Sequence, residues 1–341
     1  WCAKKLPANH GSFFIVDKAG NTPAMYIGSK HSAELLQVFP LEALLIKAPH
    51  SGLCGLLNVI QHAGDLALPV LRSLPADFDI RCMNSHKAWN FMHAVCSNPC
   101  SEELMVEALR LCPYSELTGA TMYGGPGVRM PPPCATFCTA PLLVAVKSDI
   151  PTEALVLLLE KLDDDALSVQ DSMGATALHM AASNPRQAVA LLRFLPPEAL
   201  ALANCNGETA VVTLYDTRPN EEQLAITMAE RMDGEALETI TVQRSTVLIR
   251  AVKHGHTAVV EAILSKISEE AMLHVDREGR NALHYAVEMV ARRGNCDLLL
   301  VLLRALPYAA RVARDVDGRT PADMAIGTPA AQFFTSATKA A

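Results

Sequence analysis

Short apolar segments alternate with polar turns along the chain, and the same pattern returns at a regular interval. Each copy opens with Asp or Asn, has Gly three residues later, and continues through Thr or Asn into Ala-Leu-His-x-Ala or a variant of it. The copies occupy residues 17–26, 171–181, 276–286 and 315–325, with a looser one at 204–210. This spacing puts the apolar residues on one face of a short helix. The pattern therefore predicts a turn followed by a helix in each copy.

Weaker copies fill the gaps and give the period of the repeat. They lie at residues 55–60, 90–95, 140–145 and 245–264. The position equivalent to Thr falls at 22, 55, 90, 140, 176, 209, 246, 281 and 320, so that the steps are 33, 35, 50, 36, 33, 37, 35 and 39 residues. A period in this range is typical of repeat architectures, so the sequence predicts an all-α array.

The residue types of each copy have a physical reason. Asp or Asn accepts a hydrogen bond from the backbone two residues on, and Gly supplies a positive φ. Thr is a favourable helix N-cap, and Pro directly after it loses no hydrogen bond. We therefore expect Thr at the start of each first helix to cap it.

The phrase resembles the ankyrin repeat, whose hallmark is a turn followed by Thr-Pro-Leu-His-x-Ala. The resemblance implies an α-solenoid of about nine helix-turn-helix repeats that forms a single array over residues 1–341. In that family the His bonds the neighbouring turn, so we expect the histidines to be structural rather than catalytic. The residues expected to build the repeats are Thr22, His93, Thr176, His179, Thr209, Thr246, His284 and Thr320.

A second recurrence departs from the family pattern. Pro, Asp or Ser follows the last apolar residue of each second helix, and Glu or Asp often comes two or three residues later. This order is typical of the first turn of a helix, where the dipole favours acidic side chains. We therefore predict a short extra helical turn in each repeat, which accounts for most steps longer than 33 residues. The recurrence begins at Phe39, Leu74, Cys112, Leu162, Leu195, Met232, Ile267 and Leu306.

The step of 50 residues contains an insertion. Residues 117–139 are rich in Gly and Pro and cannot be helical. Two interpretations remain open for this loop, a flexible spacer and a binding loop.

The resemblance also implies a row of groove-facing positions, one between the His and the Ala of each first helix. Most of them are apolar or aromatic, which is typical of a partner surface, whereas the alternative is that helix packing buries part of the row. Trp89 stands beside the row at a turn, either as a binding anchor or packed on a neighbouring turn. From these positions we take Tyr26, Trp89, Met180, Arg250 and Tyr285 as the candidate partner-binding residues. The full row is Tyr26, Val59, Ala94, Val144, Met180, Thr213, Arg250, Tyr285 and Met324.

Charge and composition narrow the class of partner. The net charge is −7, and its excess lies in residues 151–341, with 18 basic and 25 acidic side chains. Without a basic stripe, nucleic acid is not expected as a partner. No apolar run approaches the roughly 20 residues of a transmembrane helix. The ten scattered cysteines suggest an intracellular, cytoplasmic protein. An organelle such as the mitochondrion stays open because the chain begins with Trp1.

Motifs of known chemistry are missing, so we predict no catalytic residue, metal or cofactor. Gly124–Gly127 lacks the Lys of a phosphate loop, Cys134 and Cys138 lack further ligands, and Asp163–Asp165 lacks the spacing of a calcium loop. Two functions remain. The first, modestly favoured, is a non-enzymatic protein-binding scaffold that is a subunit of a larger assembly. The second is a soluble adaptor that binds a peptide or protein transiently.

Overall fold

The computed structural model describes residues 11–27, 33–83, 89–97, 100–118, 140–294 and 296–337. The chain divides into two compact units, Trp1–Met173 and Gly174–Ala341. The regular secondary structure of the described residues is helical, apart from two isolated bridges, Lys47 with Cys54 and Ala203 with Thr209. The predicted all-α class and solenoid organisation are confirmed. The count of nine repeats and the single array over 1–341 stay predictions.

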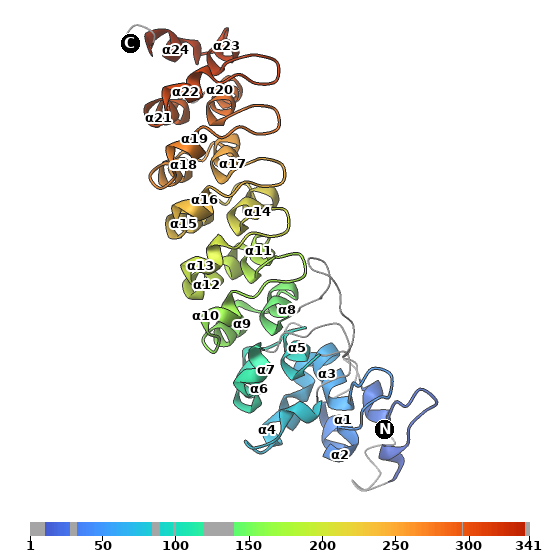
Figure 1. Ribbon diagram of the computed structural model, residues 1–341. Helices are drawn as coiled ribbons and strands as arrows, with labels where there is room; N and C mark the ends of the chain where they lie inside the picture. Colours follow the sequence, from blue (N-terminus) through green and yellow to red (C-terminus); the bar gives the residue numbers. More distant parts are fainter. Residues whose placement is uncertain are drawn as a thin grey trace. The chain divides into compact units, whose positions relative to one another are not determined.

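In the second unit, two rows of helices stack repeat upon repeat (Figure 1). Each first helix contacts the first helix of the next repeat, and from α12 to α21 each second helix does the same in its own row. The first helices are α11 (Ala177–Ala181), α14 (Ala210–Thr217), α17 (Val247–His254), α20 (Ala282–Arg293) and α23 (Pro321–Ala325). The second helices are α12 (Pro185–Phe194), α15 (Glu222–Arg231), α18 (Thr257–Leu264), α21 (Asp297–Ala305) and α24 (Ala331–Ala337).

A short third helix follows the second helix of the repeats, as the sequence predicts. The residues expected to start it do so: Asp233 accepts the backbone N–H of Ala236 at 2.8 Å, and Ser268 accepts that of Ala271 at 3.2 Å. Pro196 and Pro307 hold the same N-cap position without donating an N–H. These helices are α13 (Pro197–Ala201), α16 (Gly234–Leu237), α19 (Glu269–Met272) and α22 (Tyr308–Val312).

The turns before the first helices explain the Asp and Gly of the repeated phrase. The Asp276 carboxylate accepts the backbone N–H of Glu278 at 2.9 Å, and Gly279 has φ +69°. At Gly207, a Cβ atom would lie 2.8 Å from the carbonyl oxygen of Ile240 in the next turn. Neighbouring turns are therefore in backbone contact, and only glycine fits there.

One turn of the second unit does without glycine. Arg244 takes the left-handed position with φ +58°. Its carbonyl oxygen accepts a hydrogen bond of 2.8 Å from His274 Nε2, and the Thr241 hydroxyl accepts the backbone N–H of Ser245 at 3.1 Å. These side-chain contacts support a conformation that costs roughly 1 kcal/mol for a residue with a Cβ atom.

The first unit follows the same plan with more variation. Its first-helix row is η3 (Pro23–Tyr26), α3 (Gly55–Ala63), α5 (Phe91–Cys96) and α8 (Pro141–Lys147). Its second-helix row is α1 (Ala33–Val38), α4 (Leu68–Ser73), α6 (Glu102–Leu111) and α9 (Thr152–Leu159). The third helices are α2 (Leu41–Leu44), α7 (Tyr114–Thr118) and α10 (Asp164–Leu167). Three further short 3-10 helices are η2 (Gly11–Phe14), η4 (Gly64–Ala67) and η5 (Ile80–Met83).

Two features of the first unit differ from the regular repeat. After Leu74, where the recurrence also predicts a helical turn, Pro75 starts a plain turn closed by the N–H of Phe78 on its carbonyl at 3.1 Å. The next helical residues are those of η5. The predicted non-helical insertion, residues 117–139, is placed too early, because Leu117 and Thr118 belong to α7, and from position 119 onward it lies outside the described residues.

Candidate partner-binding surface

The groove-facing row is not a continuous exposed stripe. Val59 and Ala94 are fully buried, Val144 and Tyr285 are less than a tenth exposed, and only Tyr26 is well exposed, at 62%. Of the two interpretations of this row, the structure therefore supports the burial of part of it. Adjacent first helices contact each other, so side chains of one repeat cover those of the next. The remaining members, Met180, Thr213, Arg250 and Met324, are half-buried.

The candidate residues of the first unit have local partners. The Tyr26 hydroxyl donates a short hydrogen bond to Asp17 and accepts one from Asn21 Nδ2 at 3.3 Å. The bond from Tyr26 holds the pKa of the Asp17 carboxyl below its usual range. The half-buried Trp89 ring lies 5.9 Å from the His93 ring. Both interpretations of Trp89, a binding anchor and packing on a neighbouring turn, stay predictions.

The repeat histidines link each first helix to polar groups around it. In α11, His179 Nδ1 accepts the backbone N–H of Thr176 at 3.1 Å, and its Nε2 donates to the Glu208 carbonyl of the next turn at 2.8 Å. His284 makes the equivalent contacts with Asn281 at 3.2 Å and with the Arg319 carbonyl at 3.2 Å. Burial lowers the pKa of His284, which keeps the ring neutral. His93 is fully buried, and its Nδ1 accepts the N–H of Asn90 at 3.3 Å.

The threonines at the helix starts divide into two groups. Thr246 and Thr320 accept the backbone N–H of the third helical residue at 3.3 and 3.2 Å, as expected of N-caps. Thr22 and Thr209 occupy the same position, but their side chains do not cap the helix. Both hydroxyls are buried and have no hydrogen-bond partner among the described residues. For these two, the predicted capping by the side chain is wrong, because the hydroxyl does not reach the helix N–H groups.

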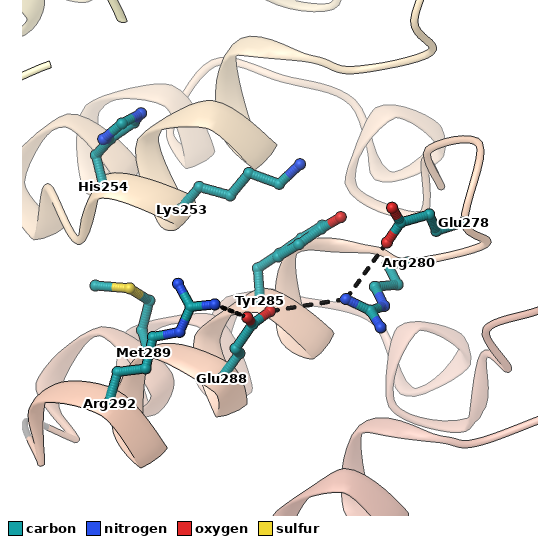
Figure 2. A pocket seen from close by; sticks show the side chains of 8 residues that line it. All are labelled: Lys253, His254, Glu278, Arg280, Tyr285, Glu288, Met289 and Arg292. Atoms are coloured by element: carbon teal, nitrogen blue, oxygen red, sulfur yellow. Dashed lines mark hydrogen bonds and ion pairs between the residues drawn. The ribbon is translucent and has the colours of Figure 1, made fainter. Parts of the chain in front are cut away.

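A cleft of about 380 Å³ lies where α17 meets α20 (Figure 2). The Tyr285 side chain forms part of its wall. Its hydroxyl donates to Asp276 Oδ2 at 2.5 Å, and Lys253 Nζ lies 4.0 Å from the centre of its ring. The cleft is lined by Lys253, His254, Glu278, Arg280, Tyr285, Glu288, Met289 and Arg292.

The ion pairs that Lys253 and Arg280 make in this cleft are loose. Arg280 Nη1 lies 3.4 Å from Glu278 and 3.7 Å from Glu288, and Lys253 Nζ lies 3.7 Å from Asp276. All three distances exceed the roughly 2.7–2.9 Å of a charge-assisted hydrogen bond. Burial lowers the pKa of Lys253, since the charged amine is only partly hydrated.

A second cleft of about 250 Å³ shares Lys253 and Glu278 with the first. Arg250 contributes to it and is fixed by Asp216, whose Oδ1 lies 2.5 Å from Arg250 Nη1. The lining residues are Gln243, Ser245, Arg250, Lys253, Asp276, Arg277 and Glu278.

The two clefts therefore bring together two of the candidate residues, Arg250 and Tyr285, whereas Met180 on α11 lines neither. Sequence reasoning missed Lys253 and Arg280. Arg250 and Lys253 are three residues apart and so share a helix face, which is a signal that the sequence contains. Arg280 precedes the N-cap Asn281, and its charged neighbours come from its own turn, from α20 and from the following turn.

Histidine and tyrosine rings form a cluster next to the first cleft. The Tyr215 ring stacks on His254 at 5.3 Å and contacts His256 at 5.4 Å. Burial lowers the pKa of both histidines, so the rings favour the neutral form. Within the described residues, no group of three or more His, Cys, Asp or Glu side chains is arranged to hold a metal ion. No helix in the described ranges is long and apolar enough to span a membrane.

Comparison with known proteins identifies the repeat. A family model of ankyrin repeats in three copies matches residues 200–310, which include both clefts. Proteins of this family generally act as non-enzymatic modules of protein–protein interaction. No curated protein matches the chain.

Solved structures with similar folds include ankyrin repeat proteins. The ankyrin repeat domain of Bcl-3, a unique member of the IkappaB protein family, is 22% identical over 68% of this chain and 92% of that chain, with a TM-score of 0.44. The ankyrin repeat protein EF0377 is 21% identical over 57% and 92%, with a TM-score of 0.42.

A third similar chain comes from the complex of the predatory endopeptidase Bd0816 of Bdellovibrio bacteriovorus with the immunity protein Bd3460. It is 24% identical over 54% of this chain and 90% of that chain, with a TM-score of 0.38. The matched family model and the capped turn-helix pattern of the second unit show that residues 200–310 are similar to ankyrin repeats.

Proposed function

We propose that this protein is a non-enzymatic scaffold that binds partner proteins through α17, α20 and the turns before them. The observation that carries the proposal is the surface itself, where two polar clefts adjoin exposed apolar turn residues. Val242 is 60% exposed in the turn before α17, and Val316 is 71% exposed in the turn before α23. Apolar side chains exposed around a concave polar site are typical of a protein interface.

The chemistry of the clefts supports binding rather than catalysis. Their side chains are mainly Arg, Lys and Glu in ion pairs with one another. The Ser245 hydroxyl is buried and has no hydrogen-bond partner among the described residues, so no base activates it.

A footprint experiment tests the location. Hydrogen exchange of the chain is compared before and after it binds a partner purified with it. We expect slower exchange in peptides that cover residues 240–254 and 276–292. Protection confined to the second helices α15 and α18 would contradict the proposed surface.

We further propose that the chain is a subunit of a larger assembly. Exposed apolar side chains occur on the third helices as well as the turns: Tyr308 is 70% and Val312 48% exposed. A subunit with several apolar surfaces self-associates when its partners are absent. Sedimentation velocity over rising protein concentration is therefore expected to show growing species. A chain that stays monomeric throughout would favour the adaptor.

A further inference from the structure

We infer that the clefts beside Tyr285 bind an acidic segment of the partner protein, with a carboxylate seated between Lys253 and Arg280. This inference rests on the proposed function and deepens it by naming the chemistry of the partner. Figure 2 shows that the two cations flank the Tyr285 side chain, one from α17 and the other from the turn before α20.

In the described ranges, the Lys253 amine lacks a hydrogen-bond acceptor, because the nearby Asp276 carboxylate already accepts hydrogen bonds from other groups. Asp276 Oδ1 accepts the backbone N–H groups of Glu278 at 2.9 Å and of Arg280 at 3.1 Å. Its Oδ2 accepts the Tyr285 hydroxyl at 2.5 Å. These three bonds fix the carboxylate in the turn, so Lys253 Nζ stays 3.7 Å away. Within the described part of the chain, the amine makes no direct hydrogen bond.

The Arg280 side chain also lacks a close hydrogen-bond acceptor in these ranges, because carboxylates near it are engaged by other groups. Asp315, 3.9 Å from Arg280 Nε, accepts the backbone N–H groups of Asp317 and Arg319 and the Arg319 guanidinium. Glu288 is engaged by Arg292. Among the described residues the Arg280 side chain therefore makes no hydrogen bond, and its buried Nε has only the loose ion pair with Asp315.

Both cations can still be reached. The Lys253 side chain is 34% exposed and that of Arg280 is 22% exposed. An incoming carboxylate that bonds them would replace loose ion pairs by charge-assisted hydrogen bonds in a partly desolvated site. Met289 and the Tyr285 ring, which are 8% and 7% exposed, would contribute only their edges to the contact with the rest of the segment.

The charge of the clefts differs in sign from that of the surrounding sequence. Arg250, Lys253, Arg277, Arg280 and Arg292 outnumber Asp276, Glu278 and Glu288 among the lining residues. The carboxylates in the same clefts would repel a polyanion with one charge per phosphate, which favours an acidic peptide over nucleic acid.

The test measures binding of a labelled peptide to the full chain by fluorescence anisotropy. The probe is a peptide of about 12 residues in which Glu alternates with Leu or Ser, a length that spans neighbouring repeats. The matched peptide has Gln in place of every Glu. We expect the Glu peptide to bind at least about tenfold more tightly, and its affinity to fall as salt rises from about 50 to about 200 mM.

Variants locate the site. Lys253→Met and Arg280→Gln are each expected to weaken binding of the Glu peptide about tenfold, the loss of a charge-assisted hydrogen bond. Arg193→Gln removes an exposed arginine from α12 with the same change of charge and should alter affinity less than about twofold. If Arg280→Gln lowers the melting temperature, Lys253→Met carries the test, because its amine makes only a loose ion pair with Asp276 and a contact with the Tyr285 ring.

Three results would overturn the inference: equal affinity for the Glu and Gln peptides, equal loss in Arg193→Gln, or displacement of the probe by an oligonucleotide or inorganic phosphate at lower concentration than by unlabelled Glu peptide. The proposed function would survive these results if the partner footprint still covers α17 and α20. Conversely, the proposed function alone would fail if the Glu peptide binds at Lys253 and Arg280 but the partner protects another surface.

Discussion

The two units begin their first helices in different ways. In the second unit the side chains of Thr246, Asn281 and Thr320 each accept a backbone N–H of the helix they precede, whereas that of Thr209 does not. In the first unit the Asn90 side chain also accepts such an N–H, but Cys54 offers a thiol at 3.4 Å, and Ala140 has no side-chain acceptor. The first unit therefore depends more on packing and less on capping. The difference teaches that an ankyrin-like repeat tolerates an incomplete phrase when its helices are well buried.

The largest effect is expected from the turn contact in the second unit. Gly207→Ala puts a Cβ atom 2.8 Å from the Ile240 carbonyl at a φ of +71°. Strain and clash together should lower the free energy of unfolding by about 2–3 kcal/mol. Gly318→Ala has a similar φ of +77° but no atom within 4 Å, so it should cost about 1 kcal/mol. Denaturant unfolding of both variants measures the difference, and equal losses would show that the contact does not matter.

Removing a repeat histidine should rank next. His284→Ala deletes hydrogen bonds to both its own N-cap and the following turn and should cost about 1–2 kcal/mol. His93→Ala gives the counterpart in the first unit. Thermal and denaturant melts check both variants. Loss of a chemical activity in a variant that stays folded would instead show that the histidine is catalytic.

Removing a helix cap from the second unit and adding one to the first tests directly how much each unit depends on capping. Thr246→Ala removes an existing cap and should lower the free energy of unfolding by about 1 kcal/mol. Ala140→Ser offers the first unit an oxygen that it lacks and should raise this free energy by about 0.5 kcal/mol. Hydrogen exchange of peptides from α17 and α8 measures each effect locally. A destabilised Ala140→Ser chain would mean that the buried site excludes a hydroxyl.

The smallest effect concerns pH and belongs to the second unit. The pKa values of His254, His256 and His284 are lowered by burial, so the unfolded chain binds more protons just below pH 6.5. Their contribution to stability is complete above about pH 6.5 and is lost as pH falls toward the lowered values. Around His254, the charges of His256, Arg250 and Arg293 act in the same direction as burial, and Asp216 opposes them.

The melting temperature of the chain should therefore be lower at about pH 5.5 than at about pH 7. In His254→Gln this difference should be smaller. If the difference in melting temperature between the two pH values is unchanged in His254→Gln, another group is responsible for it.

The fold could be predicted because the phrase acts locally. Asp276, Gly279 and Asn281 each satisfy a backbone requirement within a few residues, so their order alone specifies the turn and the helix start. Pro196, Asp233 and Ser268 mark the third helices in the same way. At Pro75 the same signal does not produce a helix, since favourable capping is too weak to decide an element by itself.

The candidate surface was less predictable because it depends on neighbours from other repeats. Tyr285 has the residue type of a binding anchor, yet Lys253 from the preceding repeat covers its ring and Asp276 fixes its hydroxyl. Similarly, the ion pairs of Arg280 with Asp315 and Glu288 are loose because both carboxylates are engaged by other groups. Neither competition between partners nor coverage by a neighbour follows from the type of one residue.

Backbone bonds between successive turns also have a mechanical consequence. Val242 N–H donates to the Asn206 carbonyl at 2.8 Å, and Val316 N–H donates to that of Glu278 at 2.9 Å. A pulling force along the second unit would load these contacts in series, so that repeats detach one after another. Each detached repeat of 33 to 39 residues would release roughly 120–140 Å of chain at about 3.6 Å per residue. Under tension, the second unit would thus unfold in discrete steps, one repeat at a time.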